Sequence, residues 1–172
     1  MIDLPAEASG LLPTPLWMEK TKGQRWFLGN TYHMAIGQGD VLATPIQMNR
    51  TVAAVVSGEW CRPQIKSPPK ADQPMAEACR SVGTSDENRQ TVIEGMREVC
   101  MTGGTAFPFF NLKGRVICKT GTAQHGGEKT KPHAWIAVVL DDIVITVMLE
   151  EAGEGSYEAG PVAREIVDYL LR

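Results

Sequence analysis

The sequence predicts an α+β fold built around an antiparallel sheet, and two observations in its last third carry this prediction. Two runs rich in β-branched residues, 134–140 and 143–150, are separated only by Asp141-Asp142, so they should form a tight antiparallel hairpin. A third run, 115–118, precedes them, and segments with helical spacing lie before and after the strands. Strands followed or preceded by separate helices are typical of the α+β class.

The first predicted helix begins at Thr44-Pro45, because threonine can cap a helix and proline suits the first helical position. Gln47 can return a hydrogen bond to the cap, and Ser57-Gly58 is a plausible end. Its residues are apolar almost all round, which predicts a helix buried inside a domain.

A second helix should begin after Ser85, with Asp86 and Glu87 favourably placed in its first turn, and end at Gly103-Gly104. A third should open at Pro161 and pack on the sheet. Each has one apolar face, formed by Val92, Ile93, Met96, Val99 and Cys100 in the second helix and by Val162, Ala163, Ile166, Val167 and Leu170 in the third.

The remaining segments show no regular period. Residues 1–40 contain scattered prolines, glycines and large aromatic rings, which predicts an irregular loop packed onto something else. Residues 59–84 carry four prolines and are predicted to be a surface excursion with short helical pieces. We therefore divide the chain into a loop and helical part, 1–112, and a strand, hairpin and C-terminal helix part, 113–172. Three strands make a thin sheet, and an apolar sheet of this kind usually has more.

Composition excludes several classes of function. The 172 residues carry a formal charge of −3 with scattered Lys and Arg, which argues against a nucleic-acid or anionic-membrane binder. No apolar run approaches the ~18 residues of a membrane span, and no signal-peptide pattern opens the chain. The four cysteines and three histidines fit no metal-ligand spacing, so no metal or cofactor is implied. We expect mostly buried free thiols, although an even number of cysteines permits disulfides in an oxidising compartment.

The most informative segment is Lys119-Thr120-Gly121-Thr122, at the end of the strand predicted from Arg115. In a strand, Lys119 and Gly121 share one face and Thr120 and Thr122 the other, so a ligand touching both sets must lie along the strand edge. The lysine supplies positive charge, the threonines supply hydroxyls suited to a carboxylate, and the glycine allows close approach. K-T-G is a signature of penicillin-binding proteins and serine β-lactamases, although the tripeptide alone is a weak signal.

Several other short segments accompany the K-T-G segment along the chain. The series resembles the C-terminal part of the transpeptidase domain of class B penicillin-binding proteins, of the penicillin-binding protein 2 (elongation) type, over nearly the whole chain. It comprises Ile36-Gly37-Gln38-Gly39-Asp40, Thr44-Pro45-Ile46-Gln47, Gly95-Met96-Arg97-Glu98-Val99, Gly104-Thr105-Ala106, the K-T-G segment, His133-Ala134-Trp135 and Gly155-Ser156, with Ile2-Asp3-Leu4-Pro5-Ala6-Glu7 and Leu12-Pro13 at the start.

The resemblance implies a peptidoglycan D,D-transpeptidase that cross-links cell-wall stem peptides by serine acyl transfer. Lys119 and Thr122 would be its catalytic residues in this chain, with the Thr122 N–H as one oxyanion donor, and Thr120 and Gly121 would bind substrate. Its ligands would be D-Ala-D-Ala stem peptides and β-lactams, and its partner a cell-wall polymerase. The full-length protein would be anchored to the bacterial inner membrane and face the periplasm.

The sequence departs from the family at the nucleophile. The S-x-x-K and S-x-N motifs precede the Gly-Gln-Gly segment in the family and would lie upstream of Met1, which predicts a partial serine β-lactamase/transpeptidase-like fold and an isolated chain without activity. Ser67-Pro68-Pro69-Lys70 spells S-x-x-K, but its prolines suit an extended turn, and Ser85 is a helix cap. A glycine often stands in the family at the position of Cys118. Two alternatives remain: a serine β-lactamase-like hydrolase and a non-catalytic truncated interaction module.

Overall fold

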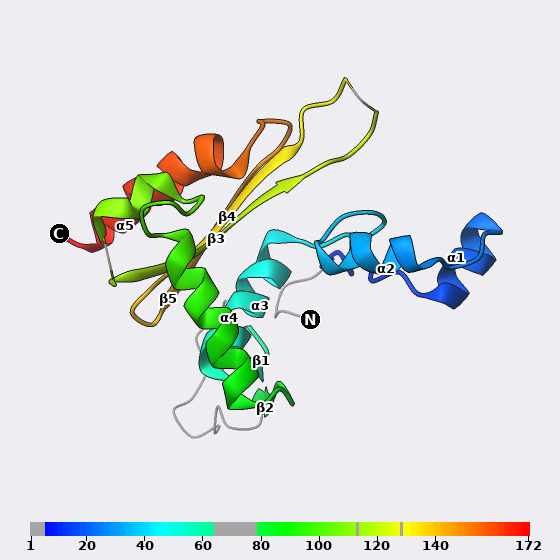
Figure 1. Cartoon of the computed structure of the whole chain (residues 1–172), viewed down its shortest axis with the longest axis horizontal. Helices are drawn as coiled ribbons and strands as arrows, with labels where there is room; N and C mark the ends of the chain where they lie inside the picture. The colour runs from blue at the N-terminus through cyan, green and yellow to red at the C-terminus, as the bar shows by residue number, and fades with distance from the viewer. Residues whose placement is uncertain (1–5, 64–78, 113, 128) are drawn as a thin grey trace. The chain divides into compact units, whose positions relative to one another are not determined.

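The computed structural model describes residues 6–63, 79–112, 114–127 and 129–172 (Figure 1). Residues Ala8–Thr44 form one compact unit, here called the helical unit, and the other described residues form a second, the sheet unit. Within the described part of the chain, no helix has the length and apolar character needed to cross a bilayer.

The sheet unit is built on three antiparallel strands, β3 (Val116–Ala123), β4 (His133–Leu140) and β5 (Ile143–Leu149), in the order β3-β4-β5. Asp141 adopts a left-handed φ of 53° in the two-residue turn between β4 and β5. The predicted hairpin is therefore confirmed, as are the α+β class and the K-T-G strand, with boundaries shifted by one residue.

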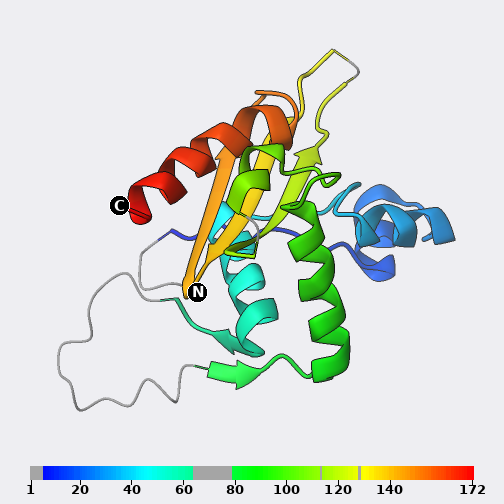
Figure 2. The same ribbon diagram turned by 60° about the vertical axis from the view of Figure 1, so that its left-hand side comes forward.

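Helical elements cover both faces of this sheet (Figure 2). One face packs under the C-terminal helix α5 (Gly160–Leu170), the 3-10 helix η2 (Phe107–Leu112) and the single π-type turn η3 (Gly155–Ala159). The other packs against α3 (Pro45–Ser57) and α4 (Asp86–Val99). The larger core cluster includes Phe109, Val116, Cys118, Ile136, Val138, Ala163 and Val167, and the smaller one consists of Val52, Met96, Ala137 and Val139.

Both predicted central helices are present. Helix α3 ends at Ser57 and is followed by Gly58 with φ +81°, whereas α4 begins after Ser85, whose hydroxyl accepts the Asn88 N–H at 3.3 Å. The expected full burial of α3 is wrong, because only Val52 and Ala54 are buried. On α4 the predicted apolar face is buried at Ile93, Met96 and Cys100, but Val92 is 51% exposed.

Helix α5 begins one residue before the predicted Pro161 and directly follows η3. Its small residue Ala163 and its Val167 are completely buried against the sheet. The rest of the predicted apolar stripe, namely Val162, Ile166 and Leu170, is about two-fifths exposed, so the buried stripe is narrower than the sequence predicts.

The described ends of the excursion at 59–84 form strands, and the short helical pieces predicted for it do not occur among its described residues. Strands β1 (Glu59–Cys61) and β2 (Cys79–Ser81) form a two-stranded antiparallel ladder in which Cys61 lies opposite Cys79. Residues between the two strands lie largely outside the described part, and so does the Ser67–Lys70 sequence that spells S-x-x-K.

The expectation of free thiols is also wrong, because all four cysteines are joined in disulfides, Cys61–Cys79 and Cys100–Cys118. Strand pairing brings the first pair's Cα atoms to 3.9 Å. Packing of the α4 end on β3 brings the second pair's Cα atoms to 5.6 Å. Sequence spacing could not reveal either pairing, since both depend on which elements lie side by side.

The prediction of an irregular loop over residues 1–40 is wrong where the helical unit forms two short helices. These are α1 (Pro15–Lys22) and α2 (Leu28–Ala35). Thr14 caps α1 by accepting the Trp17 N–H at 3.1 Å, and Gly23 ends it with φ 64°. The large side chains are less packed than expected, because so short a segment encloses little core. Those most exposed are Leu12, Leu16, Phe27, Leu28, Tyr32, Ile36 and Leu42.

Candidate active site

The candidate site is the outer edge of β3, where the K-T-G residues lie. Among the described residues, β3 forms a ladder only with β4, so it is an edge strand of the sheet. Lys119 and Thr122 are exposed there, whereas Thr120 and Gly121 are half-buried. An extended peptide could therefore add backbone hydrogen bonds along this strand while it meets the side chains of Lys119, Thr120 and Thr122.

Lys119 and Gly121 occupy the face of β3 that carries the smaller core cluster. The Lys119 ammonium donates a hydrogen bond to the Thr120 carbonyl oxygen at 2.5 Å, which holds the charge close to the strand. A Cβ built on Gly121 would lie 3.3 Å from the Trp135 Cβ across the ladder, a tight contact. Gly121 thus leaves the backbone accessible where a larger residue would crowd the neighbouring strand.

Thr120 and Thr122 occupy the opposite face, and each contacts a residue that sequence reasoning did not place in the site. The Thr120 hydroxyl lies 2.7 Å from the Thr105 hydroxyl, which comes from the segment after α4. The Thr122 hydroxyl accepts the Gly155 N–H at 3.4 Å, at the start of η3. Thr105 and Gly155 stand in motifs that carry the family resemblance, which is the signal that could have pointed to them.

Gly155 fits against the strands because it lacks a side chain. A Cβ at this position would overlap the carbonyl oxygens of Gly121 and Trp135. The turn η3 therefore lies directly on the backbone of β3 and β4 at the level of the K-T-G residues. This contact supports the strand from the face opposite Lys119.

The two histidines that flank the β3–β4 loop, His125 and His133, stack on each other. Their ring centroids are 3.9 Å apart and nearly parallel. His133 accepts the Glu151 N–H through Nδ1 at 3.1 Å, and His125 Nε2 lies 3.0 Å from the Lys131 carbonyl oxygen. These contacts tie the loop to the end of β5, consistent with a structural role.

One cluster of potential metal ligands occurs among the described residues, formed by Glu59, Cys61 and Cys79, whose ligand atoms lie within 4.8 Å of one another. The two sulfurs are bonded to each other and are therefore not thiolates that could coordinate an ion. Nearby, the Arg50 guanidinium stacks on Trp60, with 4.2 Å to the ring centroid. Burial, followed by the charge of Arg80, lowers the pKa of Arg50, while Glu7 raises it.

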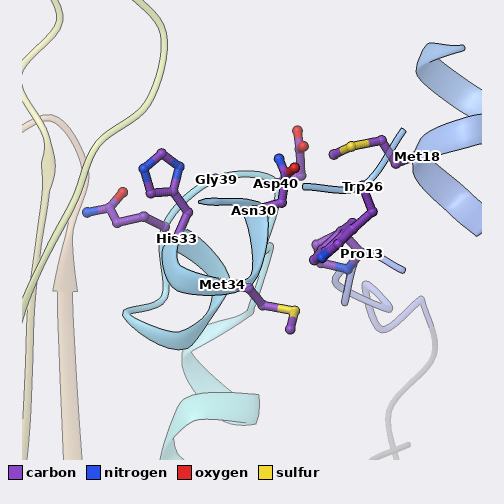
Figure 3. Close-up of a pocket in the computed structure, with 9 residues that line it drawn as sticks. Pro13, Met18, Trp26, Asn30, His33, Met34, Gly39 and Asp40 are labelled. Atoms are coloured by element: carbon purple, nitrogen blue, oxygen red, sulfur yellow. The ribbon is translucent and has the colours of Figure 1, made fainter. Parts of the chain in front are cut away.

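The helical unit has a small hollow of its own, shown in Figure 3. Trp26, His33, Met34 and Asp40 are among its lining residues, and Asp40 is engaged in an ion pair with Lys22 at 2.6 Å. Its volume is about 240 Å³ including open solvent. That is below the usual size of a small-molecule pocket, so the β3 edge is the better candidate site.

Nearly the whole chain is similar to one known protein family. Residues 1–170 match the penicillin binding protein transpeptidase domain. The chain belongs to this family. Similar curated proteins include the peptidoglycan D,D-transpeptidases MrdA of Haemophilus influenzae, 28% identical, and of Escherichia coli K12, 26% identical. Each alignment covers 99% of this chain but only 30% and 31%, respectively, of the relative.

Solved structures of the same family share the fold. The penicillin-binding protein PBP2 of Helicobacter pylori in complex with MreC matches with a TM-score of 0.80 and 32% identity, over 99% of this chain and 32% of that protein. PBP2 of Pseudomonas aeruginosa in complex with WCK 5153 matches with 0.79 and 32%, over 98% and 40%. The chain therefore has part of the serine β-lactamase/transpeptidase fold and spans about a third of the length of these transpeptidases.

Proposed function

We propose that these 172 residues supply the substrate-binding strand of a peptidoglycan D,D-transpeptidase that cross-links stem peptides by serine acyl transfer. One observation carries the proposal: a transpeptidase-family chain presents Lys119, Thr120, Gly121 and Thr122 on β3, which is an edge strand of the described sheet. The curated relatives, which are D,D-transpeptidases, favour this reaction over β-lactam hydrolysis.

The proposed ligand is the D-Ala-D-Ala end of a stem peptide. Its terminal carboxylate would accept hydrogen bonds from the Thr120 and Thr122 hydroxyls, and the Lys119 ammonium would favour its negative charge. The scissile carbonyl would lie near the Thr122 N–H, which would serve as one oxyanion donor. β-Lactams, which mimic this peptide, would bind along the same edge.

The chemical step follows from these positions together with the family's serine. The serine oxygen attacks the penultimate D-Ala carbonyl carbon and loses its proton to a base, giving a tetrahedral intermediate. The C–N bond then breaks, the terminal D-Ala leaves as an amine that takes up a proton, and an acyl-enzyme forms. An amine on a neighbouring stem peptide attacks this ester and releases the serine.

We place the serine outside the 172 residues, because Ser67–Lys70, which spells S-x-x-K, follows the Gly-Gln-Gly segment, whereas the family's motif precedes it. The isolated chain is therefore expected to bind ligand without forming an acyl-enzyme. Two disulfides fit an oxidising compartment, so we propose that the domain acts on the periplasmic side of the inner membrane. A cell-wall polymerase is the partner we propose for the full-length protein.

Fluorescent penicillin tests this assignment. The purified chain should remain unlabelled, and a covalent adduct at any of its serines would overturn the placement of the nucleophile. In a longer form that includes the nucleophile, Lys119→Ala should slow acylation about 100-fold, because the charge that holds the peptide's carboxylate in position for attack is removed. An unchanged acylation rate in that variant would refute the role of the strand. Binding of a cell-wall partner by a longer form without any penicillin reactivity would favour the interaction module.

A further inference from the structure

We propose that Thr105 is a positioning residue for the peptide's anionic terminus, acting through the hydroxyl of Thr120. This inference rests on the proposed function and assigns a role to a residue outside the K-T-G strand. Its basis is the 2.7 Å contact between the two hydroxyl oxygens, which joins the segment after α4 to the middle of the site.

The segment that carries Thr105 is held firmly on both sides. The Ala106 N–H donates to the Val99 carbonyl oxygen at 2.9 Å, and Ala106 itself is fully buried. A Cβ on Gly104 would overlap the carbonyl oxygens of Glu98 and Val99, so the chain turns back directly on the last turn of α4. Thr105 is thus presented to β3 from a backbone that has little freedom to move.

A second link fixes the same two elements to each other. The disulfide of Cys100 and Cys118 joins the end of α4 to β3 two residues before Thr120. The covalent link sets the spacing of the backbones, and the hydroxyl pair then lies between them. The orientation of the Thr120 side chain is therefore coupled to a rigid neighbouring segment.

A bound anion determines which of the two hydroxyls, Thr105 or Thr120, donates the hydrogen bond between them. Each threonine hydroxyl has one proton and can accept as well as donate. In the free site either oxygen can be the donor. A carboxylate only accepts, so Thr120 must donate its proton to the ligand and accept the proton of Thr105. A hydroxyl that accepts one hydrogen bond is polarised and becomes a better donor in the next.

The exposure of Thr105 and Thr120 indicates that their hydrogen bond orients the Thr120 side chain more than it stabilises the fold. Thr105 is exposed and Thr120 half-buried, so water can replace either partner in the free protein. The net stabilisation from such a hydrogen bond is small. Thr105→Val, which keeps the side-chain shape and removes the hydroxyl, should therefore leave the melting temperature nearly unchanged while affecting the ligand.

The test titrates the isotopically labelled chain with N-acetyl-D-alanyl-D-alanine and with its C-terminal amide, followed by NMR. Thr105→Val should weaken binding of the free acid about 10-fold and of the amide less than 2-fold, because the amide lacks the anion. Thr105→Ser, which restores the hydroxyl, should bind the acid within 2-fold of the parent chain. In a Thr120→Val background, Thr105→Val should have no additional effect.

Each contrary result is decisive. Equal affinity of Thr105→Val and the parent chain for the acid would overturn the inference, and so would an equal loss for the amide. An undiminished effect in the Thr120→Val background would mean that Thr105 does not act through Thr120.

A measurement without ligand separates this inference from the proposed function. Three-bond couplings to the Thr120 γ-carbon report its χ1 angle. They should indicate one rotamer in the parent chain and in Thr105→Ser, and averaging in Thr105→Val. A fixed rotamer in Thr105→Val would overturn the positioning role even if peptide binds. Failure of the parent chain to bind either peptide would instead overturn the proposed function and with it the ligand assigned to this pair.

Discussion

Cys100, at the end of α4, is joined by a disulfide to Cys118, the residue directly before Lys119. Both cysteines are buried in the core between the sheet and α5. The disulfide therefore links the end of α4 covalently to β3. Its cysteine on β3 is the residue next to Lys119, the charged residue of the candidate site. The stability of the fold and the placement of the K-T-G residues are thus connected through one bond.

Loss of this disulfide should destabilise the sheet unit. Replacement of Cys100 and Cys118 by alanine removes a link across a sequence separation of 18 residues and should lower the free energy of unfolding by about 3 kcal/mol. Urea unfolding followed by circular dichroism measures the change. Peptide binding should weaken as well, because β3 loses its tether to α4.

The other disulfide provides the matched control, since Cys61–Cys79 closes the same sequence separation. It links only the short β1–β2 ladder, so its replacement should leave peptide binding unchanged even if stability falls. Equal loss of binding in both double variants would show that the Cys100–Cys118 link has no particular connection to the site.

Gly155→Ala should disturb the site from the face opposite Lys119. The added methyl group would overlap carbonyl oxygens of β3 and β4, so η3 must shift at a cost of about 2 kcal/mol. Gly127→Ala is the control, because no described atom lies within 4 Å of the position where its Cβ would be. Thermal unfolding should distinguish the two, and a Gly155→Ala chain as stable as Gly127→Ala would contradict the observed packing.

Gly95→Ala should stabilise the chain. Gly95 lies in the interior of α4 on its exposed side, and the described residues leave open space around its Cβ position. Alanine is favoured over glycine in a helix by about 1 kcal/mol. Urea unfolding should therefore show a higher midpoint concentration for Gly95→Ala than for the parent chain. A lower midpoint would contradict the open space around residue 95 on α4.

Arg164 should prove important for attaching α5 to η2. Its guanidinium donates to the Pro108 carbonyl oxygen and to Asn111 Oδ1, both at 2.5 Å, and also pairs with Asp168 at 2.8 Å. Arg164→Ala should cost about 2 kcal/mol in the free energy of unfolding, and Arg164→Lys should recover less than half, because an ammonium cannot reproduce the planar fork. Full recovery by lysine would show that charge alone suffices.

Much of the secondary structure of the sheet unit could be predicted, because it depends on residues that are close together in the sequence. Ser85 before a periodic apolar segment, and Asp141-Asp142 between two β-branched runs, each determine their own neighbourhood. The K-T-G strand could likewise be located from its residue types, and the strand period placed Thr120 and Thr122 on one face.

The remaining features depend on contacts between distant segments. The pairing of Cys61 with Cys79 requires the β1–β2 ladder, and the contact of Thr105 with Thr120 requires α4 to pack beneath β3. The helices α1 and α2 were missed because each has only eight residues and prolines or aromatic residues dominate their neighbourhood. Such short helices carry a weak periodic signal.

The most direct test of the central claim maps where a D-alanyl peptide binds on the labelled chain. With N-acetyl-D-alanyl-D-alanine, we predict amide shift changes concentrated at Val116–Ala123, much reduced in Lys119→Gln. Shift changes confined to the helical unit, or equal affinity in the parent chain and Lys119→Gln, would contradict the assignment of this strand edge as the binding site.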